Sequence, residues 1–232
     1  MEQFGGAAPF GRSESGYGLW QKLVNLASTA LVALFVTHAA AAAPTRIVAF
    51  GDSLTAGYGV APEEAFPARL QSWLHEHGVE AEVVNAGVSG DTSAGGLARL
   101  DWTLAEPADA VLVEFGANDA LRGIDPQSTY QNLDGILSKL DARKVKVLLL
   151  GMVSPANWGR DYQQSFDAIY PALAERHHVL LYPFFLEGVA LDSSLNQGDM
   201  LHPNARGIET IVAHVGPYVL RLLGAQASGG NG

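Results

Sequence analysis

The chain has 232 residues, of which 48% are hydrophobic and 16% charged, a composition typical of one folded globular domain. Its formal net charge of -10 argues against a nucleic-acid partner, because an acidic surface repels phosphates. The sequence contains no cysteine, which excludes a disulfide framework, a thiolate nucleophile and a cysteine-based zinc site.

The first predicted element is a secretory signal peptide with its leader, at residues 1–43. Arg12 and Lys22 supply positive charge ahead of an almost uncharged apolar run at residues 23–36, and small residues follow it. A charged flank, a short apolar core and a small-residue exit are the pattern of a signal peptide. We therefore expect the protein to be exported, to the periplasm or out of the cell.

A cleavage site is expected at the end of this segment. Ala40 and Ala42 satisfy the small-x-small rule, so cleavage after Ala42 would give a mature chain that begins at Ala43. Two alternatives stay open. The apolar run could be an uncleaved anchor, although it is shorter than the ~20 residues of a spanning helix, or the true start codon could lie downstream of Met1.

From residue 45 onward, short apolar runs alternate with longer amphipathic segments, which predicts alternating strands and helices. In chain order the predicted elements are strand 46–50, helix 62–77, strand 82–85, helix 93–104, strand 110–115, helix 126–142, strand 145–150, helix 162–177, strand 179–182 and helix 204–223.

Near-continuous apolar strands joined by helices predict an α/β fold, in which a parallel sheet is covered on both faces. We expect one domain at residues 44–225 and a disordered tail at 226–232. Ligands bind outside the carboxyl ends of the strands in such sheets. The residues directly after each strand are therefore the candidates for a functional site.

The first predicted strand is followed by Gly-Asp-Ser-Leu at residues 51–54. Ser53 would stand at or near a helix N-terminus, where free N–H groups favour a nucleophilic hydroxyl and its developing oxyanion. Taken alone, the segment is explained more simply as an ordinary helix cap.

Two later loops offer hydrogen-bond donors. Gly90, after the second strand, allows its backbone N–H to approach a ligand closely, and Asn118, after the third strand, carries a neutral side-chain amide. The alternatives are a plain loop around Gly90 and an Asx-turn at Asn118.

The last candidate pair is Asp199 and His202. If this segment curls into one turn, the carboxylate accepts from one imidazole nitrogen and leaves the other free as a base. The alternatives are a capping Asp beside a surface His and a fragment of a metal site. We expect no metal, because no second cluster has convincing ligand spacing. Together with Ser53, Gly90 and Asn118, the pair completes the set of groups needed for acyl transfer.

These residues stand in four ordered blocks, at residues 50–54, 85–90, 116–119 and 199–203. With them the chain resembles the SGNH superfamily of GDSL hydrolases over about residues 47–222. Further stretches, at residues 89–93, 96–100, 118–123, 155–159 and 182–186, are similar to one branch. That branch contains the multifunctional periplasmic acyl-CoA thioesterase I, arylesterase and lysophospholipase L1.

The resemblance implies a flavodoxin-like three-layer sandwich with a five-stranded parallel sheet. It implies Ser53 as nucleophile, His202 as base and Asp199 as the residue that orients the base. The oxyanion hole would consist of the Ser53 and Gly90 backbone N–H groups and the Asn118 side chain.

More loosely, the resemblance implies substrate contacts at Leu121, Arg122, Met152 and Trp158. The implied substrates are aryl esters, acyl thioesters and lysophospholipids, hydrolysed without a metal or cofactor. We expect a monomer that acts on small molecules, with no nucleic acid and no stable membrane span after cleavage. Two rival hypotheses are a carbohydrate or peptidoglycan O-deacetylase on the same scaffold and a non-catalytic flavodoxin-like binding module.

Overall fold

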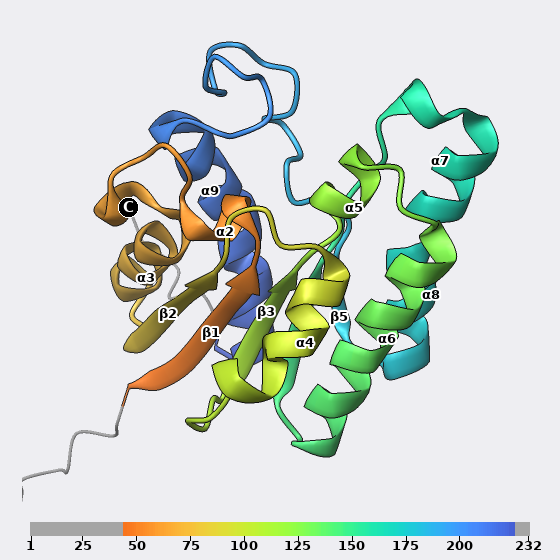
Figure 1. Ribbon diagram of the computed structural model, residues 1–232. Helices are drawn as coiled ribbons and strands as arrows, with labels where there is room; N and C mark the ends of the chain where they lie inside the picture. Colours follow the sequence, from red (N-terminus) through yellow and green to blue (C-terminus); the bar gives the residue numbers. More distant parts are fainter. Residues whose placement is uncertain (1–43, 226–232) are drawn as a thin grey trace, which may run out of the picture. The chain divides into compact units, whose positions relative to one another are not determined.

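Five parallel strands form one sheet in the order β2-β1-β3-β4-β5, in a computed structural model that describes residues 44–225 (Figure 1). The strands are β1 (Thr45–Gly51), β2 (Ala81–Gly87), β3 (Ala110–Glu114), β4 (Lys146–Leu150) and β5 (Leu180–Tyr182). The strand order reverses between β1 and β3, and such a switch point is where parallel sheets bind ligands. The predicted signal segment at 1–43 and the predicted tail at 226–232 lie outside the described residues.

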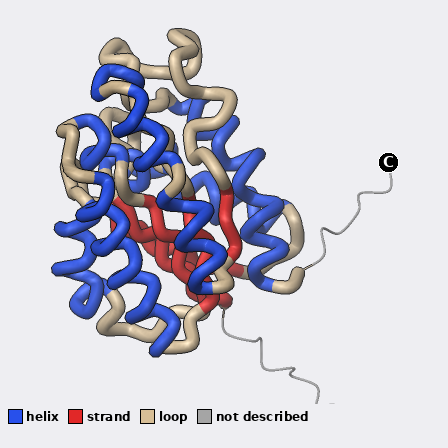
Figure 2. Tube along the Cα trace, turned by 90° about the vertical axis from the view of Figure 1, so that its right-hand side faces the viewer, coloured by secondary structure: helices blue, strands red, loops and turns tan. Residues whose placement is uncertain are grey.

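Helices cover both faces of this sheet. They are α2 (Ser53–Ala56), α3 (Phe66–Glu76), α4 (Ser93–Thr103), α5 (Ala117–Leu121), α6 (Pro126–Ala142), α7 (Arg160–Asp167), α8 (Ile169–His177) and α9 (Ala205–Leu223), with short 3-10 turns η1 (Pro62–Glu64) and η2 (Ala156–Trp158). Helices α3 and α9 pack together on one face, and α4, α6 and α8 line the other. Figure 2, seen from the side of α6 and α8, shows these helices in front of the strands. In the part of the chain that is described, no helix combines the length and the apolar character needed to cross a bilayer.

The core lies where the central strands meet the two helical layers. All five residues of β3 are buried, and so are residues 47–51 of β1. Strands buried on both faces carry near-continuous apolar runs, which is the pattern that the sequence shows. The predicted α/β fold with a five-stranded parallel sheet is therefore confirmed. One charged residue, Glu114, stands at the end of the otherwise apolar β3.

The predicted helix at 126–142 has the bounds of α6, but two other predicted helices differ from the structure. The segment 62–77 begins with a 3-10 turn, and its α-helix starts only at Phe66. The segment 162–177 is interrupted at Ala168 and forms α7 and α8 instead of one helix. The reason is Pro171, which has no N–H to donate to the residue 167 carbonyl and whose ring crowds that carbonyl.

Candidate active site

The candidate nucleophile stands at the turn from β1 into α2. Ser53 is the first residue of α2, and Asp52 caps this helix by accepting the Leu54 N–H at 3.0 Å. The turn is tight because Gly51 has no side chain: a Cβ there would lie 2.5 Å from Glu114 Oε2. The fold therefore presents Ser53 at the carboxyl edge of the sheet.

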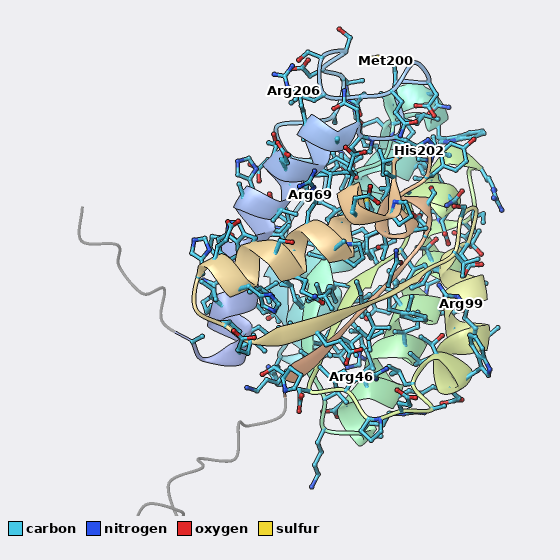
Figure 3. The ribbon with its side chains drawn as sticks, turned by 90° about the vertical axis from the view of Figure 1, so that its left-hand side faces the viewer. Arg46, Arg69, Arg99, Met200, His202 and Arg206 are labelled. Carbon is cyan, nitrogen blue, oxygen red and sulfur yellow. The ribbon has the colours of Figure 1, made fainter. Side chains whose placement is uncertain are left out.

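The candidate base comes from the loop between β5 and α9. His202 Nε2 lies 2.9 Å from Ser53 Oγ, and His202 Nδ1 lies 2.6 Å from Asp199 Oδ2. Because a carboxylate only accepts, the imidazole proton sits on Nδ1 and leaves Nε2 as acceptor for the Ser53 hydroxyl. Figure 3 shows His202 at the opposite end of the sheet from Arg46, which lies near the start of β1.

Asp199 is held in place by three donors. Its Oδ1 accepts the backbone N–H groups of Leu201 and His202, each at 3.0 Å, while its Oδ2 accepts from the imidazole. The hydrogen bond from the His202 side chain, supported by these two N–H groups, lowers the pKa of Asp199 to about 2. The carboxylate is thus ionised at neutral pH and can stabilise a positive charge on the imidazole.

Two residues that the sequence patterns did not single out hold this loop against the segment after Ser53. Gln197 Nε2 donates to the Tyr58 carbonyl at 2.7 Å and to the Pro203 carbonyl at 2.9 Å. The Tyr58 ring packs on the His202 ring, with centroids 4.6 Å apart. The contacts of Tyr58 with Gln197 and with His202 join segments far apart in the chain, so no local motif could indicate them.

The two other predicted donors come from the segments after β2 and β3, on the same edge. Asn118 Nδ2 donates to Asp52 Oδ2 at 3.0 Å, and the amide carries a second N–H. Gly90 has a left-handed φ of 85°, which permits the sharp turn after β2. Arg122 connects them, since its Nη2 donates to the Gly90 carbonyl at 2.9 Å and lies 3.4 Å from Asn118 Oδ1. Arg122, predicted as a substrate contact, therefore also orients the Asn118 amide.

The remaining predicted substrate contacts differ in exposure. Leu121 and Trp158 are 46% and 45% exposed, and the Trp158 Nε1 donates to the Ala120 carbonyl at 2.7 Å, which fixes the indole beside α5. Met152 is only 3% exposed and packs in the hydrophobic core. The structure therefore brings Leu121 and Trp158 to the surface but leaves Met152 no surface to offer a substrate.

Exposed apolar side chains gather on the segments that follow the strands. We call this set the apolar rim: Tyr58, Val88, Leu121, Val153, Trp158, Met200 and Leu201. The segments after all five strands contribute to it. Exposed apolar side chains on the segments at this edge of the sheet are suited to contact acyl or aryl groups. Sequence reasoning identified only Leu121 and Trp158 in this set, because an exposed apolar residue in a loop has no distinctive pattern.

Two charged side chains connect the segments beneath the site by hydrogen bonds. Asp119 is fully buried and accepts the Ser93 N–H at 2.9 Å, which ties the start of α4 to α5. Arg99 donates to the Gly51 carbonyl at 2.9 Å and to Asp91 at 2.6 Å, which ties the loop after β2 to the turn before Ser53. These hydrogen bonds hold the loops after β1, β2 and β3 at fixed relative positions.

Within residues 44–225, no group of three or more histidine, aspartate or glutamate side chains is arranged to hold a metal ion. That the reaction needs no metal or cofactor remains a prediction from the sequence.

Comparisons with known proteins show the family to which the chain belongs. Residues 49–209 match the model of the GDSL-like lipase/acylhydrolase family. Esterase TesA of Pseudomonas aeruginosa is 41% identical over 199 residues, which cover 85% of this chain and 98% of the relative. Thioesterase 1/protease 1/lysophospholipase L1 of Escherichia coli is 46% identical over 176 residues, covering 75% of this chain and 82% of the relative.

A solved structure shows the same likeness in three dimensions. The psychrotrophic esterase EstA from Pseudoalteromonas sp., inhibited by monoethylphosphonate, superposes with a TM-score of 0.74 at 32% identity. The match covers 78% of this chain and 99% of that one. The likeness therefore extends over essentially the whole length of the solved esterase.

Proposed function

Since the chain belongs to the GDSL-like lipase/acylhydrolase family and is a serine esterase, we propose that Ser53 is its nucleophile, with His202 as general base and Asp199 as the residue that orients it. One observation carries this proposal: His202 lies between Ser53 Oγ at 2.9 Å and Asp199 Oδ2 at 2.6 Å. A nucleophile, a base within hydrogen-bond reach and a third group that orients the base are the arrangement of an activated serine. A non-catalytic binding module would not require this arrangement of the three side chains.

The reaction begins when His202 Nε2 takes the Ser53 hydroxyl proton and Oγ attacks the ester carbonyl carbon. The negative charge that develops on the carbonyl oxygen is held by the Ser53 and Gly90 backbone N–H groups and by the free N–H of Asn118. Asp199 stabilises the imidazolium and keeps the ring in the productive tautomer. These donors are fixed before substrate arrives, which limits the reorganisation needed in the transition state.

The tetrahedral intermediate then collapses. The C–O or C–S bond to the leaving group breaks, and the leaving alcohol or thiol takes the proton from His202. A water molecule gives a proton to His202 and attacks the acyl-enzyme carbonyl. Collapse of this second intermediate releases the carboxylic acid and returns the proton to Ser53.

The apolar rim supports substrates with acyl or aryl groups: aryl esters, acyl thioesters and lysophospholipids. Leu121 and Trp158 flank the Asn118 side of the site and offer apolar surface there. This surface favours such substrates over the acetylated glycans of the rival hypothesis, because a long acyl chain or an aryl ring buries more apolar area than an acetyl group does. The relatives named above are an esterase and a thioesterase/lysophospholipase. We take the enzyme to act as a monomer, without a cofactor.

The signal pattern at residues 1–43 supports export to the periplasm or the medium, with a mature domain at 44–225. Expression of the full chain, fractionation and N-terminal sequencing of the product test this part. A mature N-terminus at Ala43 in the periplasmic or secreted fraction is expected. An intact N-terminus in a cytoplasmic fraction would contradict it.

Labelling with a fluorophosphonate, together with hydrolysis of p-nitrophenyl esters, tests the assignment of the nucleophile. We expect the probe to modify Ser53 alone, as read by peptide mass spectrometry, and Ser53→Ala to abolish both labelling and turnover. Ser138→Ala, which removes an exposed hydroxyl on α6, is the matched control and should behave as wild type. Turnover that survives in Ser53→Ala would refute the proposal.

A further inference from the structure

A buried carboxyl group lies directly beneath the turn that carries Ser53. Glu114 is the last residue of β3, is 0% exposed, and stands in register with Gly51 of β1. Almost no charged side chain is fully buried unless other groups compensate it. The proposed reaction uses no atom of Glu114, so its presence needs another explanation.

Glu114 contacts the chain on both sides of the nucleophile. Its Oε2 accepts the Asp52 backbone N–H at 3.2 Å and the Thr55 hydroxyl at 2.8 Å. Ser53 is therefore flanked by two residues that are both anchored to the same carboxyl oxygen. Movement of this oxygen would shift the turn that positions the Ser53 hydroxyl.

A second buried carboxyl group, that of Asp52, lies next to it. Asp52 Oδ1 accepts the Leu54 N–H and Oδ2 accepts the Asn118 amide, each at 3.0 Å. Both oxygens of Asp52 thus have donors, as expected for an ionised carboxylate. Glu114 Oε1, by contrast, is buried and receives no hydrogen bond from any described residue. A proton on Glu114 removes the cost of an unpaired charged oxygen there.

The charged groups around the pair do not neutralise it. The Arg99 guanidinium contacts this turn, but it donates to Asp91 and to the Gly51 carbonyl and not to either carboxyl group of the pair. On α8, the Tyr170 hydroxyl donates to the Phe115 carbonyl and not to a carboxyl group. The His202 imidazole contacts Asp199 and Ser53 and makes no hydrogen bond to Asp52 or Glu114. Two adjacent buried carboxyl groups without a cation must share a proton to avoid repulsion.

The environment decides which group keeps this proton. Burial, reinforced by the charge of Asp52, raises the pKa of Glu114 well above its ordinary value. Burial also raises the pKa of Asp52, but its hydrogen-bond donors hold it to about 6. Donors to both oxygens favour the ionised form of Asp52, whereas the buried Oε1 without a donor favours the protonated form of Glu114. At neutral pH the pair is therefore one acid and one carboxylate.

We propose that Glu114 is a positioning residue for the ester hydrolysis: as a neutral carboxylic acid it anchors the turn around Ser53 and holds Asp52, which in turn holds the Asn118 amide. This role rests on the proposed function, because it matters only if Ser53 and Asn118 act on the substrate. Glu114 itself touches neither the substrate nor the reacting atoms. It acts by fixing the positions of Ser53 and Asn118, which do contact the substrate in the proposed reaction.

Three substitutions separate a positioning role from a purely structural one. Glu114→Gln keeps a neutral group with one acceptor and one donor, so we expect kcat close to wild type. Glu114→Ala removes both, so we expect kcat to fall by about a hundredfold, the scale of a small misplacement of reacting groups, with little change in KM. Val113→Ala, a cavity variant at the preceding buried position of β3, is the matched control. It should lower Tm but leave kcat unchanged.

An infrared measurement tests the proton directly and does not depend on activity. The difference spectrum of wild type minus Glu114→Gln at pH 7 should contain the C=O stretch of a protonated carboxylic acid. Absence of that band overturns the proposal. So does a Glu114→Gln enzyme as impaired as Glu114→Ala, because the charge would then be what matters, and so does wild-type kcat in Glu114→Ala.

The proposal stays testable if one variant or one premise fails. If Glu114→Ala does not fold, Glu114→Gln and the infrared band still decide the outcome. Turnover in Ser53→Ala would overturn the proposed function and with it the catalytic part of this inference. The band would still report whether Glu114 holds the proton, so the two failures are distinguishable.

Discussion

The side-chain amide of Asn118 donates a hydrogen bond to Asp52 Oδ2 at 3.0 Å. This contact joins helix α5, which follows β3, to the residue before Ser53, across the central strand pair of the sheet. It uses one of the two amide hydrogens and leaves the other for a substrate oxygen. The position of the proposed oxyanion donor thus depends on a buried carboxylate and not on helix α5 alone.

Asn118→Ala should lower kcat by about a hundred- to a thousandfold, the usual cost of losing one oxyanion donor, with a smaller effect on KM. Steady-state hydrolysis of p-nitrophenyl butyrate measures this. Asn132→Ala is the control, because its amide donates to Ser93 Oγ and contacts neither Ser53 nor Asp52. Equal turnover in Asn118→Ala and wild type would remove Asn118 from the mechanism.

Asp199→Asn should lower kcat by about 10³- to 10⁴-fold, because an amide no longer enforces the tautomer with the proton on His202 Nδ1. The comparison is with Asp192→Asn, in the same loop, whose carboxylate accepts instead from Ser194. That variant should keep wild-type kcat. If both variants are equally active, Asp199 does not orient the base.

Asp199 should also contribute to stability in a defined acid range. Its pKa is lowered to about 2, chiefly by the hydrogen bond from the His202 side chain. A lowered pKa stabilises the fold above the unfolded value of about 4, and this contribution is lost as pH falls from about 4 through about 2. Urea unfolding between pH 5 and pH 2 should show a slightly shallower loss for Asp199→Asn than for wild type. The difference should be small, because the side chain is 38% exposed and screened by solvent. A steeper loss in the variant would contradict the assignment.

Gly51→Ala should destabilise the fold, because the added Cβ would stand 2.5 Å from Glu114 Oε2 and 2.6 Å from the Glu114 carbonyl oxygen, a backbone atom that cannot move aside easily. Overpacking of this kind costs about 1–3 kcal/mol. Gly198→Ala is the matched control, since a Cβ there meets nothing within 4 Å. Thermal unfolding of the two variants should show a clear drop in Tm for the first and almost none for the second. Equal Tm values would show that the turn is not constrained.

Trp158→Ala should reduce kcat/KM for octanoyl or aryl esters by about tenfold, the scale of a lost apolar contact, while acetate esters change less. Trp102→Ala is the control: this side chain is 81% exposed but belongs to α4, near the end of the helix that is remote from Ser53. It should leave the chain-length profile unchanged. A uniform decrease for all esters in Trp158→Ala would indicate that the indole only supports its loop.

Local patterns predicted much of this protein. Short apolar runs identified all five strands, and Pro126 at the start of α6 marked that helix correctly. The ordered blocks around Ser53, Asn118 and His202 predicted both the family and the esterase activity. These features are encoded in short stretches of sequence, where residue types and spacing are sufficient. The break between α7 and α8 was missed although Pro171 was visible, because the apolar periodicity continues across it.

Only the tertiary structure decided which of these residues meet. His202 and Ser53 are 149 positions apart, and their contact at 2.9 Å depends on the strand order and on the Gln197 hydrogen bonds that hold the loop. Met152 follows β4, as the rim residues Val153 and Trp158 do, but its side chain is buried in the core. Glu114 ends an apolar strand with no motif around it, and its importance emerges from the register that places it against Gly51. A linear pattern records propensity and spacing, whereas burial and cross-strand contact arise only once the sheet has assembled.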